Sequence, residues 1–185
     1  MPRLQTVNAA TASPELQQTF AAVQKSLGVV PNLVATLAQS PAALNAYLGF
    51  SGALAKGSLP ARLRQQIALV VGQANECDYC VAAHSLLGEK AGLSKAEVIA
   101  AREGNATDPK SAAAVVFAKK VVSEHGHVTD EDVAGLRAVG FTDGDIAEIV
   151  ANTALNIFTN YFNHVAETVV DFPAVPKLEV CSCGH

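Results

Sequence analysis

Two cysteines and a histidine that lie close together carry the clearest chemical meaning in this chain. Cys77 and Cys80 are three residues apart, and His84 follows four residues after Cys80. In a helix, side chains at this spacing share one face. A thiol in the first turn of a helix gains thiolate character from the positive end of the dipole, and a CxxC spacing lowers thiol pKa further. The pattern predicts a redox centre.

The residues alone leave the order of the two thiols open. Cys77 is nearer the expected helix N-terminus, which favours its thiolate, and in many CxxC pairs the first thiol is the nucleophile. His84 lies one turn after Cys80 and two turns after Cys77, so its imidazole can accept a proton from either sulfur. We therefore expect His84 to act as a general base.

The composition indicates a single helical domain. Of 185 residues, 50% are hydrophobic, 16% are charged and only 5% are aromatic, so Ala, Val, Leu and Ile must build the core. The net charge is −4 and we find no basic stripe, which argues against a nucleic-acid partner. The N-terminus lacks the apolar core of a signal peptide, and no apolar run matches a bilayer span. We expect a cytoplasmic protein without a membrane partner.

Helix start and stop signals recur along the chain, and strand signals do not. Capping residues, first-turn prolines and helical spacing of apolar residues predict an all-α fold. The expected helices cover about 14–27, a short piece after Pro31, 41–57, 60–75, 77–91, 94–102, 109–122, 129–138 and 143–170. We expect Asn75 to cap the helix that carries the cysteines. Residues 1–172 would form the domain, and Pro173 and Pro176 would keep residues 173–185 as an extended tail.

These residues carry a family resemblance. The segment from Pro60 to Leu69, which runs into Cys77-Asp78-Tyr79-Cys80-Val81-Ala82-Ala83-His84, resembles the core of the carboxymuconolactone decarboxylase superfamily in its alkylhydroperoxidase D-like branch. The segment from Asn156 to His164 is similar to the long closing helix of peroxidase-related members. The resemblance covers roughly residues 15–172, and the cysteine–histidine motif is its most specific part.

The resemblance implies an all-helical bundle that assembles as a symmetric homo-oligomer and reduces hydroperoxides. It implies that Cys80 attacks the peroxide, and that Cys77 then condenses with the resulting sulfenic acid to form a disulfide. An external dithiol, lipoyl or thioredoxin-like, would regenerate the pair. Such an enzyme needs no metal or other cofactor.

One position departs from the family pattern. Members with the full proton relay carry a glutamate twelve residues before the first cysteine, where this chain has Gln65. Glutamine can hold an imidazole by a hydrogen bond but cannot take up a proton. Glu76 is the nearest acid in sequence, although an acid beside a helix start can simply face solvent. Tyr79, between the cysteines, fits a pocket wall better than an acid, because a phenol titrates near pH ~10.

Two other functions remain open at this point. Cys77 and Cys80 could bind a metal together with Cys181 and Cys183, beside His185, although short termini are usually disordered and structural zinc prefers a CxxC in a tight turn. A cofactor-free decarboxylase or other lyase of the same superfamily is the second alternative. That chemistry has no need of paired cysteines, so their presence counts against it.

Overall fold

The computed structural model describes residues 1–178, and this part of the chain is entirely helical. It contains one 3-10 helix, nine α-helices and no strand. The elements are η1 (Ala9–Thr11), α1 (Pro14–Leu27), α2 (Asn32–Leu37), α3 (Pro41–Leu54), α4 (Ala61–Ala74), α5 (Asp78–Lys90), α6 (Lys95–Glu103), α7 (Pro109–Ser123), α8 (Asp130–Ala138) and α9 (Asp143–Ala166). The expected all-α class is confirmed. None of the described helices is long and apolar enough to cross a membrane.

Side-chain caps start most of these helices, because a serine, threonine or aspartate oxygen accepts a backbone N–H that the first turn leaves unpaired. The predicted caps that the structure confirms are Ser13, Ser40, Ser94, Asp108, Thr129 and Thr142. One expected cap was wrong: Asn75 ends α4, and Cys77 caps α5 instead. The last helix stops at Ala166, short of the expected Val170, because Glu167 adopts a left-handed conformation with φ 48°.

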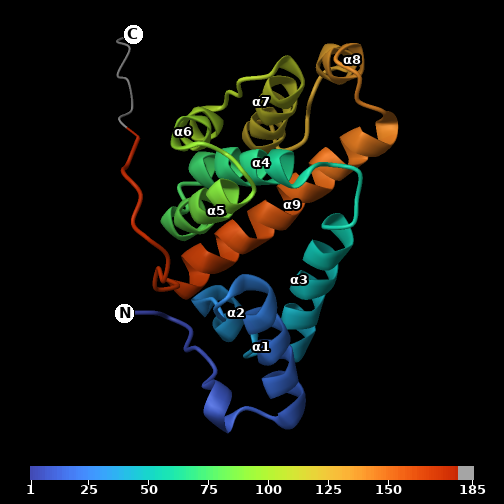
Figure 1. Cartoon of the computed structure of the whole chain (residues 1–185). Helices are drawn as coiled ribbons and strands as arrows, with labels where there is room; N and C mark the ends of the chain where they lie inside the picture. The colour runs from blue at the N-terminus through green and yellow to red at the C-terminus, as the bar shows by residue number, and fades with distance from the viewer. Residues whose placement is uncertain (179–185) are drawn as a thin grey trace.

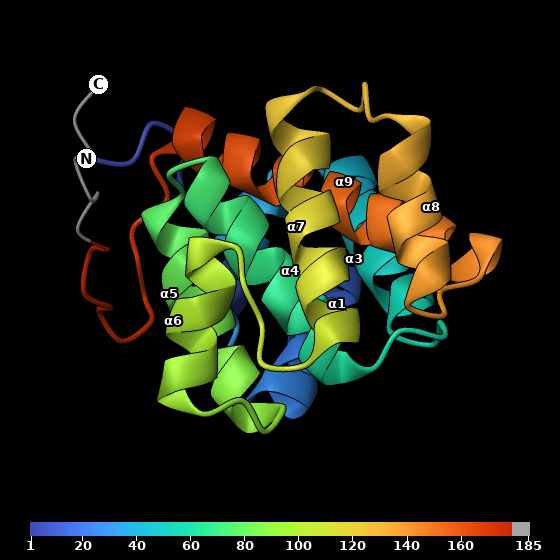
Figure 2. The same ribbon diagram turned by 90° about the horizontal axis from the view of Figure 1, so that it is seen from above.

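Helix α4 lies at the centre of the molecule. It packs against α5, α6, α7 and α9, and the buried residues of α4 include Ile67, Leu69, Val70 and Val71. Figure 1 shows α9 running obliquely across the molecule, with α4–α7 on one side of it and α1–α3 on the other. The view from above shows α5 and α6 at one end of this layer and α7 and α8 at the other (Figure 2). Two helices, α5 and α9, thus face the N-terminal helices.

The N-terminal helices add a second hydrophobic cluster that reaches the redox motif. Phe20 of α1, Leu33 of α2 and Leu44 of α3 are buried in one cluster with Cys77 and Cys80. The exposed fraction of each cysteine is only 2%. The two sulfurs therefore lie where α1–α3 cover the junction of α5 and α9.

Candidate active site

A tight turn between α4 and α5 places the cysteines. The Cys77 N–H donates to the Gly72 carbonyl (2.9 Å) and the Glu76 N–H donates to the Gln73 carbonyl (3.1 Å). These two bonds, with Glu76 at a left-handed φ of 54°, form a Schellman motif at the end of α4. Cys77 follows at once with extended backbone and becomes the N-cap of α5. The turn therefore explains Glu76 as a backbone corner whose side chain is exposed.

Cys77 and Cys80 are held against each other by the first turn of α5. The Cys77 sulfur accepts a hydrogen bond from the Cys80 N–H at 3.3 Å, in the place that a serine or aspartate oxygen usually takes at an N-cap. Both cysteines are free thiols. Cys80 alone of the two lines the large cavity described below, and Cys77 lies behind it.

Helix α9 supplies neutral hydrogen-bond donors to the Cys80 sulfur. Asn163 Nδ2 donates to Cys80 Sγ at 3.2 Å, and both residues are buried. The side chains of Asn160 and Thr159 lie near this sulfur, and Asn75 Nδ2 orients Asn160 by donating to its Oδ1 at 2.9 Å. The Cys80 sulfur thus sits among amide and hydroxyl groups that can stabilise a negative charge.

The two thiols have opposite pKa shifts. The pKa of Cys80 is lowered, first by the Cys77 thiol and then by the bond from Asn163 and the nearby Asn160 and Thr159 side chains, which together outweigh its burial. The pKa of Cys77 is raised, mainly because its hydrogen bond with Cys80 keeps it protonated and because it is buried. The surroundings of Cys80 thus favour its thiolate, and those of Cys77 favour its protonated thiol.

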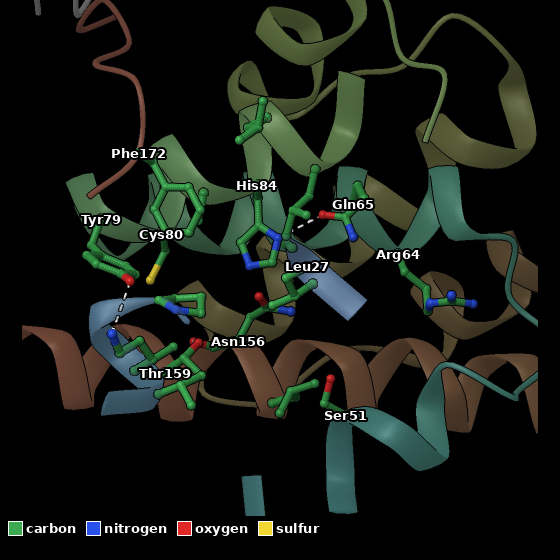
Figure 3. Close-up of a pocket in the computed structure, with 18 of the residues that line it drawn as sticks. Leu27, Ser51, Arg64, Gln65, Tyr79, Cys80, His84, Asn156, Thr159 and Phe172 are labelled. Carbon is green, nitrogen blue, oxygen red and sulfur yellow. Dashed lines mark hydrogen bonds between the residues drawn. The ribbon is translucent and has the colours of Figure 1, made fainter. Parts of the chain in front are cut away.

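His84 is held in one orientation by Gln65. His84 Nδ1 lies 2.8 Å from Gln65 Oε1, and Figure 3 shows this contact beside the cavity. Because the amide oxygen can only accept, Nδ1 carries the ring proton and Nε2 keeps its lone pair. Burial lowers the pKa of His84 to about 4, so the imidazole is neutral at pH 7. The contact confirms that the Gln65 and His84 side chains meet across α4 and α5.

A cavity of about 390 Å³ opens in front of Cys80 and His84. Its walls come from α1, α3, α4, α5, α9, the start of α2 and the segment after α9. Much of the lining is aliphatic, from Leu27, Val29, Leu33, Leu54, Leu86, Leu87 and Leu155. Such a shape and lining suit an apolar small molecule that enters with one polar group.

Two tyrosines close the thiol end of this cavity. The Tyr79 hydroxyl accepts a hydrogen bond from the Leu33 N–H at 3.1 Å, and the Tyr79 ring meets Phe172 edge-on with ring centres 5.4 Å apart. Tyr47 also lines the cavity, and burial together with the nearby Cys80 charge raises the pKa of Tyr47 to about 12. Burial likewise raises the pKa of Tyr79. Both phenols stay protonated at neutral pH, and Tyr79 forms part of the wall.

The predicted site residues therefore separate into two groups. Gln65, Tyr79, Cys80 and His84 line the cavity with Cys77 directly behind, whereas the Glu76 side chain points to solvent and has no hydrogen-bond partner in residues 1–178. Sequence reasoning did not foresee the donors from α9, because nothing in the local pattern links that helix to a cysteine 83 residues earlier. Asparagines on the buried face of a long helix were the only signal.

The proposed four-thiolate metal site cannot be compared with the structure, because Cys181, Cys183 and His185 lie outside the described residues. Within residues 1–178, no three His, Cys, Asp or Glu side chains are grouped so that they could hold a metal ion. In this part of the chain, the neighbours of the two cysteines are amides, hydroxyls and apolar groups.

Comparisons with known proteins agree with this architecture. The model of the carboxymuconolactone decarboxylase family matches residues 41–124, the stretch from α3 to α7 that contains both cysteines and His84. A crystal structure of an alkylhydroperoxidase AhpD core, an uncharacterised peroxidase-related protein from Ralstonia eutropha JMP134, is similar at 30% identity and a TM-score of 0.82, covering 95% of this chain and 98% of that one. No curated protein sequence gives a significant match.

Two further structures share the fold. An uncharacterised peroxidase-related protein from Silicibacter sp. TM1040 has 25% identity and a TM-score of 0.79, covering 91% of this chain and 94% of that one. The debrominase Bmp8, at 23% identity and a TM-score of 0.79, covers 91% of this chain and 92% of that one. A cysteine-to-alanine variant of Bmp8 was crystallised with 2,3,4-tribromopyrrole. The same fold thus occurs in a debrominase and in two proteins described as peroxidase-related.

Proposed function

This chain belongs to the carboxymuconolactone decarboxylase family, and from the arrangement of its thiols we propose that it is a thiol-dependent peroxidase that reduces organic hydroperoxides. The observation that carries the proposal is the pairing of a thiolate-favouring Cys80 at the cavity wall with a protonated Cys77 behind it. The peroxidase-related names of similar structures support the same class of reaction.

In the first step, the Cys80 thiolate attacks the terminal oxygen of the hydroperoxide. The O–O bond breaks, the sulfur becomes sulfenic acid, and the alkoxide that leaves takes up a proton to become an alcohol. Neutral His84, one turn along α5 from Cys80, takes the thiol proton on Nε2 and delivers it to the alkoxide. The thiol loses two electrons and the peroxide gains them, so no metal or flavin is needed.

In the second step, Cys77 attacks the sulfenic sulfur of Cys80. An S–S bond forms as the S–O bond breaks, and the sulfenic hydroxyl leaves as water after taking up the Cys77 proton. The first turn of α5 holds the two side chains together, since the Cys80 N–H bonds to the Cys77 sulfur at 3.3 Å. An external dithiol, lipoyl or thioredoxin-like, then reduces the disulfide and becomes oxidised itself.

Mass spectrometry after one equivalent of an organic hydroperoxide tests this reaction class. To keep only the central pair, the experiment uses the Cys181→Ser/Cys183→Ser variant, with the same protein lacking Cys80 (Cys80→Ser) as control. We expect a Cys77–Cys80 disulfide and one equivalent of alcohol, and neither in the control. Full-length protein that carries a stoichiometric metal ion, with thiols that ignore peroxide, would instead indicate the four-thiolate site. Thiols that do not react with the hydroperoxide, in a protein that carries no metal ion, would instead favour the lyase alternative.

We also propose that the protein works as a homo-oligomer. Along α9, Val150, Ala154, Phe158, Tyr161 and Val165 follow one another at helical spacing, and all five are exposed. An apolar stripe of this kind on one helix face suits a symmetric contact between copies. Light scattering should give at least a dimer mass at micromolar concentration, whereas the 19.1 kDa mass of one chain would contradict the proposal.

A further inference from the structure

The cavity in front of Cys80 has a charged end that the peroxidase chemistry does not use. Arg64 on α4 and Lys90 at the end of α5 both line it. Figure 3 shows Arg64 and Cys80 at opposite ends of the labelled lining residues, with His84 and Gln65 between them. The cavity thus connects a reactive sulfur to a pair of cations through a lining that is largely aliphatic.

The two cations are not neutralised within the described part of the chain. Arg3, Arg62, Lys120 and Arg137 each form an ion pair with a carboxylate. Within residues 1–178, neither Arg64 nor Lys90 forms one, and Arg64 makes a single hydrogen bond, from Nη1 to the Leu59 carbonyl. The one carboxylate in the cavity lining, Asp171, accepts the Asn32 N–H at 2.8 Å. The remaining donors of Arg64 and Lys90 are available to an anion.

Packing between α4 and α5 gives the separation along the helix axis between the backbone of Arg64 and the level of Cys80. The two helices run antiparallel, because a Cβ at Gly72 would meet Cys80 at 3.4 Å while a Cβ at Gly88 would lie 3.8 Å from Gln65. Arg64 precedes Gly72 by eight residues, which is roughly 12 Å along a helix at 1.5 Å per residue. An extended chain spans roughly 3.5 Å for every three bonds, so about ten bonds bridge this distance.

Resting on the proposed peroxidase function, we propose that the substrate is an aliphatic hydroperoxide that carries a carboxylate about ten bonds from the hydroperoxide group. The carboxylate binds Arg64 and Lys90, the aliphatic chain lies along Leu54, Leu86 and Leu87, and the hydroperoxide reaches Cys80. Arginine suits this task because its planar group can bind a carboxylate with two parallel hydrogen bonds. The Cys80 end offers neutral donors, which do not compete for the carboxylate.

The test compares a straight-chain hydroperoxy acid of this length with its methyl ester. We expect kcat/KM to favour the acid by about tenfold, as a charge-assisted contact predicts, with the difference mainly in KM. Arg64→Gln/Lys90→Gln should lower kcat/KM for the acid to that for the ester and so remove the preference. The matched control is Arg62→Gln/Lys95→Gln, since Arg62 pairs with Glu97 and neither residue lines the cavity. This control should keep the preference.

Binding of decanoic acid to the reduced protein, measured by calorimetry against decanol, is a readout that needs no peroxidase activity. We expect decanoic acid to bind about tenfold more tightly than decanol, and Arg64→Gln/Lys90→Gln to abolish the difference. Equal rates for acid and ester, with no preference in binding, would overturn the inference and leave the peroxidase intact. Binding of decanoic acid through Arg64 without any peroxide turnover would refute the peroxidase but keep the acid site. Slower reduction by the dithiol donor alone in Arg64→Gln/Lys90→Gln would assign the cations to the donor and overturn the inference.

Discussion

The two ends of the cavity use different means to handle negative charge. Around Cys80 the groups are buried and neutral, and the pKa of Cys80 is lowered by the Cys77 thiol, by the bond from Asn163 and by the nearby Asn160 and Thr159. At the other end Arg64 is partly exposed and Lys90 is exposed, and both are full charges without ion pairs in residues 1–178. Hydrogen bonds in a dry site can tune a pKa without binding an anion from solvent, whereas exposed cations can bind one.

This difference predicts that chemistry and recognition can be separated by mutation. Changes near Cys80 should alter the rate of sulfur oxidation for every hydroperoxide, and changes at Arg64 should alter only the binding of acidic ones.

Replacement of His84 tests the thiol end most severely. His84→Asn can keep the hydrogen bond with Gln65 but cannot relay a proton, so we expect the rate of Cys80 oxidation to fall by about 10²–10⁴-fold for acid and ester alike. Stopped-flow kinetics with one equivalent of peroxide measures this rate. His125→Asn is the matched control, because His125 is exposed and its left-handed φ of 52° suits asparagine. A lower rate of Cys80 oxidation for acidic substrates alone would contradict the separation of chemistry from substrate recognition.

The buried environment of His84 should also appear in stability. Its folded pKa of about 4 is below the ordinary value of 6.5, so between these pH values the unfolded chain binds the extra proton. The stabilising contribution is therefore complete above about pH 6.5 and is lost as pH falls toward 4. We expect wild-type protein to lose about 2 kcal/mol more than His84→Asn between pH 7 and pH 5 in chemical denaturation. Equal slopes for the two proteins would mean that His84 is not buried in its neutral form.

Gln65 sharpens the comparison, because a carboxylate in its place would bring charge into the neutral end. Gln65→Glu should raise the pKa of His84 from about 4 toward the working pH, where a general base is most effective. We expect peroxide reduction with a dithiol donor to rise by about tenfold, and His84→Ala to lower it in both backgrounds. Gln18→Glu on exposed α1 controls for added charge. An unchanged or lower rate in a folded protein of unchanged oligomeric state would mean that Gln65 only positions His84.

Asn163 gives the smallest expected effect. Asn163→Leu removes the donor to the Cys80 sulfur, together with an Oδ1 atom that is buried without a partner in residues 1–178. The pKa of Cys80 should rise, and its alkylation at neutral pH should slow by up to about tenfold. Thermal unfolding should change little, because no bonded partner of Oδ1 is left behind. An unchanged alkylation rate of Cys80 would mean that the Asn163 side chain on α9 does not help to lower the pKa of this thiol.

Local sequence signals predicted most of the fold. Ser94 with Glu97 and Thr142 with Asp145 act within four residues of chain, so their capping boxes needed no tertiary information. The cap of α5 was missed because a sulfur is an unusual capping group and Asn75 is a usual one. The left-handed Glu167 also escaped prediction, because glycine normally marks such an end.

The site was predictable only where its parts are close in sequence. Cys77, Cys80 and His84 follow from spacing on one helix, and Gln65 followed from the family resemblance. Asn163 reaches Cys80 across 83 residues, and the meeting of Arg64 with the same cavity depends on how α4 and α5 pack. The helix position of Cys77 favours its thiolate, whereas its bond with Cys80 and its burial, which depend on tertiary packing, raise its pKa.

The central claim is that Cys80 is the attacking thiolate, and the site of sulfenic acid formation tests it most directly. Cys77→Ser and Cys80→Ser are each made in the Cys181→Ser/Cys183→Ser background, treated with one equivalent of hydroperoxide in the presence of dimedone, and mapped by mass spectrometry. We predict a dimedone adduct on Cys80 in Cys77→Ser and no adduct on Cys77 in Cys80→Ser. An adduct on Cys77 in Cys80→Ser, with Cys80 unmodified in Cys77→Ser, would contradict the account.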